Sequence, residues 1–152
     1  DPHAGGALRA DALALAARNA SANGVQLRTQ RGDAFEVLDE LQRAGERFDV
    51  VVLDPPAFIK RRKDHPRGAA AYRKLNQLAM RLLERDALLV SCSCSWHLPA
   101  DELAMLIQSA GRHTSRFVQL LASGGQSPDH PVHPAIPETR YLKAFFCRVT
   151  RE

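Results

Sequence analysis

The chain has 152 residues, of which 45% are hydrophobic and 25% are charged, and its formal net charge is +4. This composition excludes a disordered chain and fits one globular domain that is long enough to bury a core. No apolar run approaches the ~20 residues that span a bilayer, and the first residues resemble neither a secretory signal nor an Arg-rich presequence, so we expect a cytoplasmic protein.

The first part of the chain predicts two helices with a strand between them. Leu8 to Ala22 is rich in alanine and leucine and predicts a helix that ends at Asn23-Gly24. Val25 to Thr29 alternates as a short strand does. Asp33 is a candidate N-cap for a second helix, which Gly45 ends.

Residues 48–58, FDVVVLDPPAF, predict a buried strand that runs into a rigid turn. Four apolar residues end at Asp54, and the two prolines that follow fix φ and remove two amide donors. An acid at the carboxyl end of a parallel strand, with the aromatic Phe58 nearby, is how α/β enzymes present a polar group to a planar substrate. We therefore expect chemistry at this turn.

A basic run follows the turn directly. It holds one acid, Asp64, and seven cations: Lys60, Arg61, Arg62, Lys63, Arg67, Arg73 and Lys74. The run thus carries +6, and the rest of the chain about −2. Charge runs are ordinarily solvated loops, but seven cations beside the predicted site favour a polyanionic partner such as RNA.

The second part of the chain continues the alternation of helix and strand. Helical spacing over Tyr72 to Leu83 is followed by a buried strand over Ala87 to Val90, which enters the sequence SCSCS. A helix over Asp101 to Ala110 and strands over Phe117 to Leu121 and Tyr141 to Val149 complete the pattern. This order predicts a single α/β domain with a mostly parallel sheet.

Two features remain outside this pattern. The connection from Ala122 to Thr139 is longer than a structureless link inside a compact domain usually is, so we expect a functional loop. The cysteines are three in number, Cys92, Cys94 and Cys147, and we expect reduced thiols. A CxC pair with scattered histidines lacks the paired spacing of structural zinc sites, so no metal is expected.

Three motifs in order, DPPAF, LLVSCSCS and DHPVHPAIPETRYLKAFFCRV, carry a resemblance to a known family. From about Ala10 to Arg148 the chain resembles the catalytic domain of the bacterial 23S ribosomal RNA cytosine-5 methyltransferases. The resemblance implies the Rossmann-like class I fold, S-adenosylmethionine as cofactor and 23S ribosomal RNA as substrate. Carbon-5 of cytosine is a weak nucleophile, so such enzymes first add a thiolate to carbon-6.

The resemblance also implies roles for individual residues. Cys94 matches the nucleophile, and Asp54 matches the acid that hydrogen-bonds the ring nitrogen. Asp33 matches the residue that meets the adenine of the cofactor. The remaining implied cofactor contacts are Ala34, Asp54 and Pro55. The implied substrate contacts are Pro56, Phe58, Lys60, Arg61, Arg62, Lys63, Arg67, Arg73, Lys74, His133 and Arg140, with His130 as a further loop residue near the pocket.

Other interpretations of these residues stay open. A cysteine at a strand end is usually a small buried hydrophobic residue, and we assign that role to Cys92 and Cys147. Asp54 can cap the following turn and Asp33 can be only a helix N-cap. Phe58 can stack on the base or pack under the turn. A methyltransferase of exocyclic amines that uses the DPPAF turn and a noncatalytic RNA-binding module are the alternative functions.

The chain departs from the family pattern at its start. The glycine-rich first strand and the acid that ends the second strand are absent, and Ala7 stands where that acid should fall. We therefore expect a carboxyl-terminal part of the catalytic domain, without any RNA-binding domain. We predict weak cofactor binding, an inactive fragment, and a sheet that is rearranged or completed by another copy through oligomerisation or strand exchange.

Overall fold

A computed structural model describes residues 4–151, with side chains from residue 11 onward, and it divides the chain into two units. The first unit, residues 1–37, holds helix α1 (Ala4–Ala22), which confirms the first predicted helix, and Gly24 follows it at φ +65°. The strand predicted over Val25 to Thr29 is wrong, because this segment has no regular secondary structure and pairs with no strand of the described residues. Without a partner strand its backbone has no ladder to join.

Helix α2 (Ala34–Arg43) crosses the boundary between the two units. Its start follows Asp33 and its end precedes Gly45 at φ +77°, as the sequence predicts. The helix is strongly amphipathic in sequence, with Glu36 in the first turn and Arg43 in the last, where these charges favour the helix dipole.

The second unit, residues 38–152, is built on a four-stranded sheet. Its strands are β1 (Phe48–Leu53), β2 (Leu83–Ser93), β3 (Phe117–Gly124) and β4 (Lys143–Thr150), in the order β1-β2-β4-β3. β1 and β2 are parallel, whereas β4 is antiparallel to both of its neighbours. The α/β class is confirmed, but parallel pairs do not predominate among the described strands, because the long connection after β3 turns the chain back into β4.

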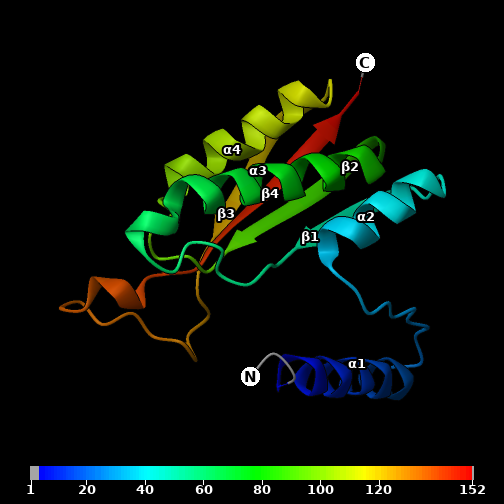
Figure 1. The fold of residues 1–152 in the computed structure, drawn as a ribbon, viewed down its shortest axis with the longest axis horizontal. Coiled ribbons are helices and arrows are strands. Elements are labelled where there is room, and N and C mark those ends of the chain that lie inside the picture. The colour runs from blue at the N-terminus through cyan, green and yellow to red at the C-terminus, as the bar shows by residue number, and fades with distance from the viewer. Residues whose placement is uncertain (1–3, 152) are drawn as a thin grey trace. The chain divides into compact units, whose positions relative to one another are not determined.

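Helices α3 (His65–Leu82) and α4 (Ala100–His113) both lie on one face of this sheet (Figure 1). The core between the layers is apolar, and Leu89 and Val149 of the sheet are fully covered. Each fully buried side chain of this size contributes about 1.5 to 3 kcal/mol of hydrophobic stabilisation. The described residues include no helix with the length and apolar character that a membrane crossing requires.

The helix predicted over Tyr72 to Leu83 starts earlier than its apolar spacing indicated. A 3-10 turn over Arg62–Asp64 leads into α3 at His65, with Pro66 in the first turn. Amides of the first turn have no acceptor within the helix, so proline removes no hydrogen bond there. The basic run is therefore partly helical. β2 likewise begins at Leu83, before the predicted strand.

β1 lies at the edge of the sheet and pairs only with β2 among the described strands. Val50 and Val52 on this strand are 52% and 61% exposed. Completion of the sheet by another copy stays a prediction.

Candidate active site at the ends of β1 and β2

The acid and the thiol singled out in the sequence emerge from neighbouring strands. β1 and β2 are parallel with Leu53 opposite Ser91, so Asp54 and Cys94 follow the two strands at the same end of the sheet. The Cys94 Sγ lies 3.9 Å from the Pro55 carbonyl oxygen. Asp54 is exposed and Cys94 is half-buried, so both remain open to a ligand.

Buried hydroxyl groups fasten the backbone on both sides of Cys94. Ser93 Oγ donates to the Tyr72 hydroxyl oxygen at 2.9 Å, and the Tyr72 hydroxyl lies 2.9 Å from Ser95 Oγ. Ser95 Oγ also accepts the Ile59 amide at 3.1 Å, and the Ser95 amide donates to Ser93 Oγ at 3.1 Å. The network ties β2, helix α3 and the turn after Asp54 into one unit, because every hydroxyl in it is buried and paired.

Helix α3 packs directly beneath the DPPAF turn. The Phe58 ring lies 4.8 Å from the Tyr72 ring, centroid to centroid, in a tilted arrangement. Gly68 permits this approach, since a Cβ at that position would stand 2.3 Å from Ile59 Cγ1 and 3.0 Å from the Phe58 carbonyl oxygen. Phe58 is half-buried, and its role toward a base stays a prediction.

Lys143 is a site residue that sequence reasoning missed. It begins β4 opposite Ser93, and its Nζ donates to the Ser95 carbonyl at 2.5 Å and to the Leu98 carbonyl at 2.7 Å. Burial lowers the pKa of the ammonium group, and the negative charge of an ionised Cys94 acts in the opposite direction. A lysine at the start of a strand gives no signal in sequence, so only the fold shows this position.

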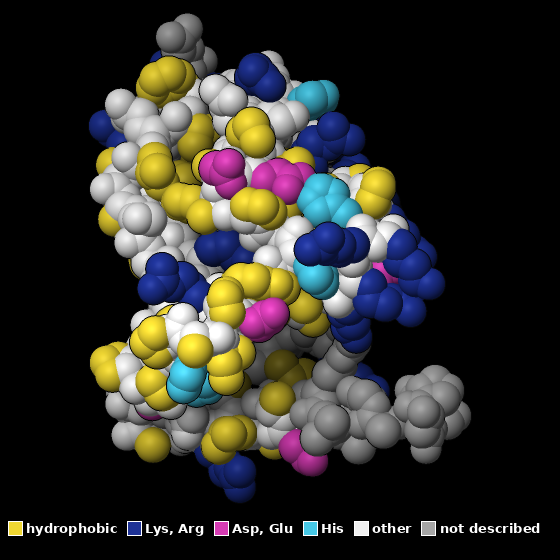
Figure 2. Space-filling view, turned by 90° about the vertical axis from the view of Figure 1, so that its left-hand side faces the viewer, with side chains coloured by type: hydrophobic (Ala, Val, Ile, Leu, Met, Phe, Trp, Pro, Cys, Tyr) yellow, Lys and Arg dark blue, Asp and Glu magenta, His cyan; other side chains and the backbone are white. Residues whose placement is uncertain are grey.

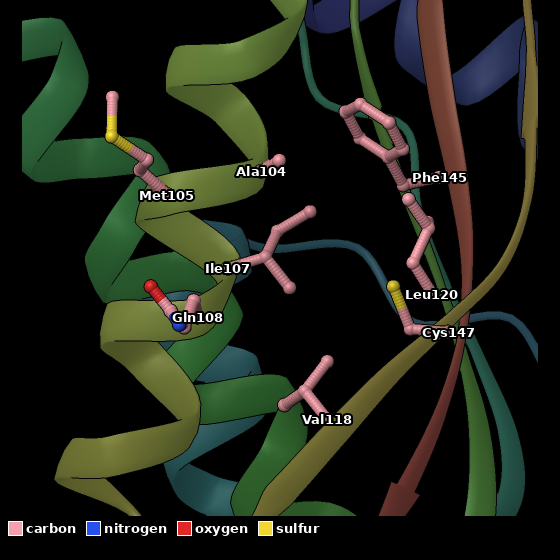
Figure 3. Close-up of a pocket in the computed structure, with 8 residues that line it drawn as sticks. All are labelled: Ala104, Met105, Ile107, Gln108, Val118, Leu120, Phe145 and Cys147. Carbon is pink, nitrogen blue, oxygen red and sulfur yellow. The ribbon is translucent and has the colours of Figure 1, made fainter.

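The other two thiols have environments that disfavour ionisation. Burial, and then the charge of Asp54, raise the pKa of Cys92. Burial raises the pKa of Cys147 to about 11. Cys147 lines an apolar cavity of about 280 Å³ between α4 and the sheet, where its side chain and that of Leu120 face Ile107 (Figure 3). These surroundings support the structural role predicted for Cys147.

Asp33 has the geometry of an N-cap. Its Oδ1 accepts the Phe35 amide at 2.9 Å and the Glu36 amide at 3.4 Å, which satisfies two amides of the first turn of α2. Ala34 is the first residue of that helix. Both residues lie in the first unit, and their role toward a cofactor stays a prediction.

All seven cations of the basic run are exposed, whereas Asp64 is half-buried. Asp64 pairs with Arg61, whose Nε lies 3.0 Å from Oδ2, and this pair lowers the pKa of Asp64 and raises that of Arg61. Figure 2 shows Lys and Arg side chains gathered along one side of the face that it views. The remaining exposed cations of the run are Lys60, Arg62, Lys63, Arg67, Arg73 and Lys74.

The Gln126 side chain joins two parts of the long connection between β3 and β4. Gln126 accepts the Tyr141 amide at 2.9 Å and donates to the His130 carbonyl at 2.9 Å. Arg140 and His130 line a cavity of about 420 Å³ within this loop, and His133 Nδ1 accepts the Ala135 amide.

Contacts between this loop and the turn would be needed to confirm the substrate roles of His133 and Arg140. Among residues 4–151, no hydrogen bond or ion pair joins either side chain to Asp54 or Cys94. Their roles in substrate binding therefore stay predictions.

Comparison with known proteins gives relatives that cover most of this chain. Ribosomal RNA large subunit methyltransferase I of Erwinia tasmaniensis is 35% identical over 141 residues, and that of Klebsiella pneumoniae is 36% identical over 142. Each match covers 91% of this chain, but the chain spans only 36% of the length of each relative. No protein-family model matches the chain.

A solved structure shows the same fold. A protein described as a methyltransferase and crystallised with SAH superposes with a TM-score of 0.71 at 20% identity, over 92% of this chain and 36% of that one. This likeness confirms the Rossmann-like methyltransferase fold that the sequence motifs predicted.

Proposed function

We propose that this chain is the base-handling part of an S-adenosylmethionine-dependent RNA methyltransferase that modifies carbon-5 of cytosine in large-subunit ribosomal RNA. The observation that carries the proposal is the meeting of Asp54 and Cys94 at the ends of two neighbouring parallel strands, with the thiol against the Pro55 carbonyl. The names of the relatives support ribosomal RNA as substrate, and the neighbour solved with SAH supports the cofactor.

The end of the sheet that holds Asp54 fits such a cofactor and substrate. Ligands of open α/β sheets bind outside the carboxyl ends of the strands, and the exposed carboxylate of Asp54 stands there as an acceptor for amino and ring N–H groups. The bound cofactor would supply the methyl group.

Cys94 begins the reaction as a thiolate that forms a bond from Sγ to carbon-6 of the cytosine. As this bond forms, the π electrons of the carbon-5 to carbon-6 double bond shift toward carbon-4, and the ring nitrogen takes a proton from solvent, which it releases again on elimination. The Asp54 carboxylate accepts a hydrogen bond from this N–H and so favours the neutral adduct. Carbon-5 then takes the methyl group and loses its proton to a base. Elimination breaks the bond to Sγ and returns the cysteine to the enzyme.

Cys94 suits this role better than Cys92, although only Ser93 separates them in the sequence. The Lys143 ammonium group donates to the Ser95 and Leu98 carbonyls, which places a positive charge beside the turn that follows Cys94. Cys92 instead faces the negative charge of Asp54, which opposes its ionisation.

Substitution of the two cysteines tests the proposal. In an enzyme completed to the length of its relatives, Cys94→Ser should lower methyl transfer to 23S RNA on the order of 10³-fold or more, whereas the matched control Cys92→Ser should retain most of it. Methyl transfer is measured with radiolabelled S-adenosylmethionine. Retention of activity by Cys94→Ser would favour a methyltransferase of exocyclic amines, in which Asp54 and the turn hold an amino group. Salt-dependent RNA binding with no transfer in any variant would indicate a noncatalytic RNA-binding module.

A further inference from the structure

The end of the sheet opposite Asp54 and Cys94 carries a cavity rich in arginine. β2 runs from Leu83 at this end to Ser93 at the other, so the two ends lie roughly 30 Å apart at about 3.3 Å per strand residue. The cavity has a volume of about 330 Å³. Its lining residues are Arg47, Leu83, Glu84, Arg85, Arg116 and Arg151.

Four separate segments of the chain supply the four arginines. Arg47 precedes β1, Arg85 lies near the start of β2, Arg116 precedes β3 and Arg151 follows β4. No run of charge in the sequence connects them. The fold gathers these side chains at one end of the sheet, which is why the sequence motifs gave no sign of the cluster.

The positive charge of the cavity is largely uncompensated. Four arginines face one carboxylate, that of Glu84, and none of the four is in an ion pair among the described residues. Arg116 is half-buried, and burial together with the charges of Arg151 and Arg47 lowers its pKa. Like charges held together raise the free energy of the folded protein, and a bound anion would relieve that repulsion.

Backbone contacts keep part of the cluster in a fixed geometry. Arg116 donates from its two terminal nitrogens to the carbonyls of Glu84 and Leu83, each at 2.5 Å. Arg85 Nε donates to the Arg151 carbonyl at 3.1 Å, and the Arg151 amide donates back to the Arg85 carbonyl at 2.8 Å. The guanidinium group of Arg47 donates to the Glu46 carbonyl at 2.7 Å, and neither Arg47 nor Arg151 forms an ion pair with a carboxylate among the described residues.

We propose that this arginine cavity is a second site for the phosphate backbone of RNA, remote from Asp54 and Cys94. Guanidinium forks match phosphate oxygens and are the preferred protein groups for them. Leu83 is the one apolar lining residue and no aromatic side chain lines the cavity, so it offers phosphates a site but offers a nucleobase no surface to stack on. The choice of RNA as the source of the phosphates rests on the proposed function.

A charge-matched pair of double variants tests the site. Arg47→Gln with Arg151→Gln removes two cavity charges and spares Arg116, while Arg81→Gln with Arg112→Gln removes two exposed charges from the last turns of α3 and α4. Binding of a 30-nucleotide RNA hairpin is measured by filter retention at several KCl concentrations, with melting temperatures as the control for folding.

We expect the cavity variant to lower the slope of log K against log salt by about 1 to 2, because each lost phosphate contact removes about 0.7 to 0.9 from it. The Arg81 and Arg112 control should change the slope less. An equal change in both variants, or no change in the cavity variant, would overturn the proposal.

Two further measurements separate this site from the proposed function. Calorimetry with inorganic tripolyphosphate tests free polyphosphate as the ligand. If the cavity variant loses tripolyphosphate binding but keeps the salt slope of RNA binding, the assignment to RNA is overturned. Methyl transfer by the Cys94 variants is an independent measurement. Retention of methyl transfer by Cys94→Ser would refute the proposed cytosine-5 chemistry, while the salt slope of RNA binding would still decide the proposal for the cavity.

Discussion

The two ends of the four-stranded sheet are built in different ways. At the end with Cys94, buried hydroxyl groups of Tyr72 and Ser95 fix the backbone around a half-exposed thiol. At the other end, Arg116 caps carbonyls after helix α3 and exposed arginines surround an open cavity. Bond-making chemistry needs reacting atoms in a precise geometry, and the end with Cys94 fixes its backbone by hydrogen bonds. Phosphate binding needs mainly positive charge, which the end with the arginine cavity presents.

Asp54→Asn should have the largest effect on methyl transfer among these variants. It should act only at the end of the sheet that carries Cys94. An amide keeps the size of the side chain but no longer favours a protonated ring nitrogen, so methyl transfer should fall about 10² to 10⁴-fold. The thiol of Cys92 should at the same time alkylate faster, because the substitution removes the charge that raises its pKa. Single-turnover methylation and iodoacetamide labelling measure the two effects. An unchanged methylation rate would remove Asp54 from the mechanism.

Tyr72→Phe should destabilise the site end. It leaves the buried hydroxyls of Ser93 and Ser95 each without one partner, at a cost of about 1 to 3 kcal/mol in the free energy of unfolding. Urea denaturation measures the change, and Tyr141→Phe, on a half-buried side chain outside the network, is the matched control. Equal stabilities of the two variants would show that the network does not hold the turn.

Lys143→Met should lower the free energy of unfolding by about 1 to 3 kcal/mol, because it removes the donor that the Ser95 and Leu98 carbonyls share. Urea denaturation measures the change, and Lys74→Met is the control, since that exposed lysine lies on α3. An equal loss of stability in both variants would show that the Lys143 contacts do not support the turn after Cys94.

Lys143 also predicts a pH dependence of stability. Burial lowers its pKa in the folded protein, so below the usual lysine range the unfolded chain binds more protons than the folded one. The contribution of Lys143 to the free energy of unfolding therefore rises with pH as the buried cation loses its proton. Denaturation series from pH 8 to 10 should show this rise in the parent chain and lack it in Lys143→Met.

The smallest effect is expected from the basic run. Arg67→Gln with Lys74→Gln should lower the salt slope of RNA binding by about 1 to 2, as the cavity variant does. Only the variant in the basic run should also raise the KM for methyl transfer, because that run follows the turn at Asp54. A rise of the same size in both variants would mean that the two ends are not distinct in function.

The sequence predicted those features that depend on local pattern. Apolar spacing located both helices of the second unit and all four of its strands, and the acid-Pro-Pro turn marked the site. The prediction of a strand over Val25 to Thr29 was wrong, because a strand forms only beside a partner strand. The strand propensity of a local sequence does not indicate whether that partner is present. Tyr72 and Lys143 were missed because their contacts also depend on the tertiary fold. In sequence Tyr72 is an ordinary core tyrosine and Lys143 an ordinary strand lysine, and each contacts Ser95 only once α3 and β4 pack beside β2.

The central claim is that Cys94 forms a covalent bond to the base, and trapping that bond tests it most directly. The enzyme completed to the length of its relatives is incubated with S-adenosylmethionine and 23S RNA that contains 5-fluorocytosine, whose fluorine blocks the final elimination. We predict an RNA adduct that survives denaturation, maps to Cys94 by mass spectrometry, forms with Cys92→Ser and is absent with Cys94→Ser. Methylation of unmodified RNA without any adduct would contradict the thiolate mechanism.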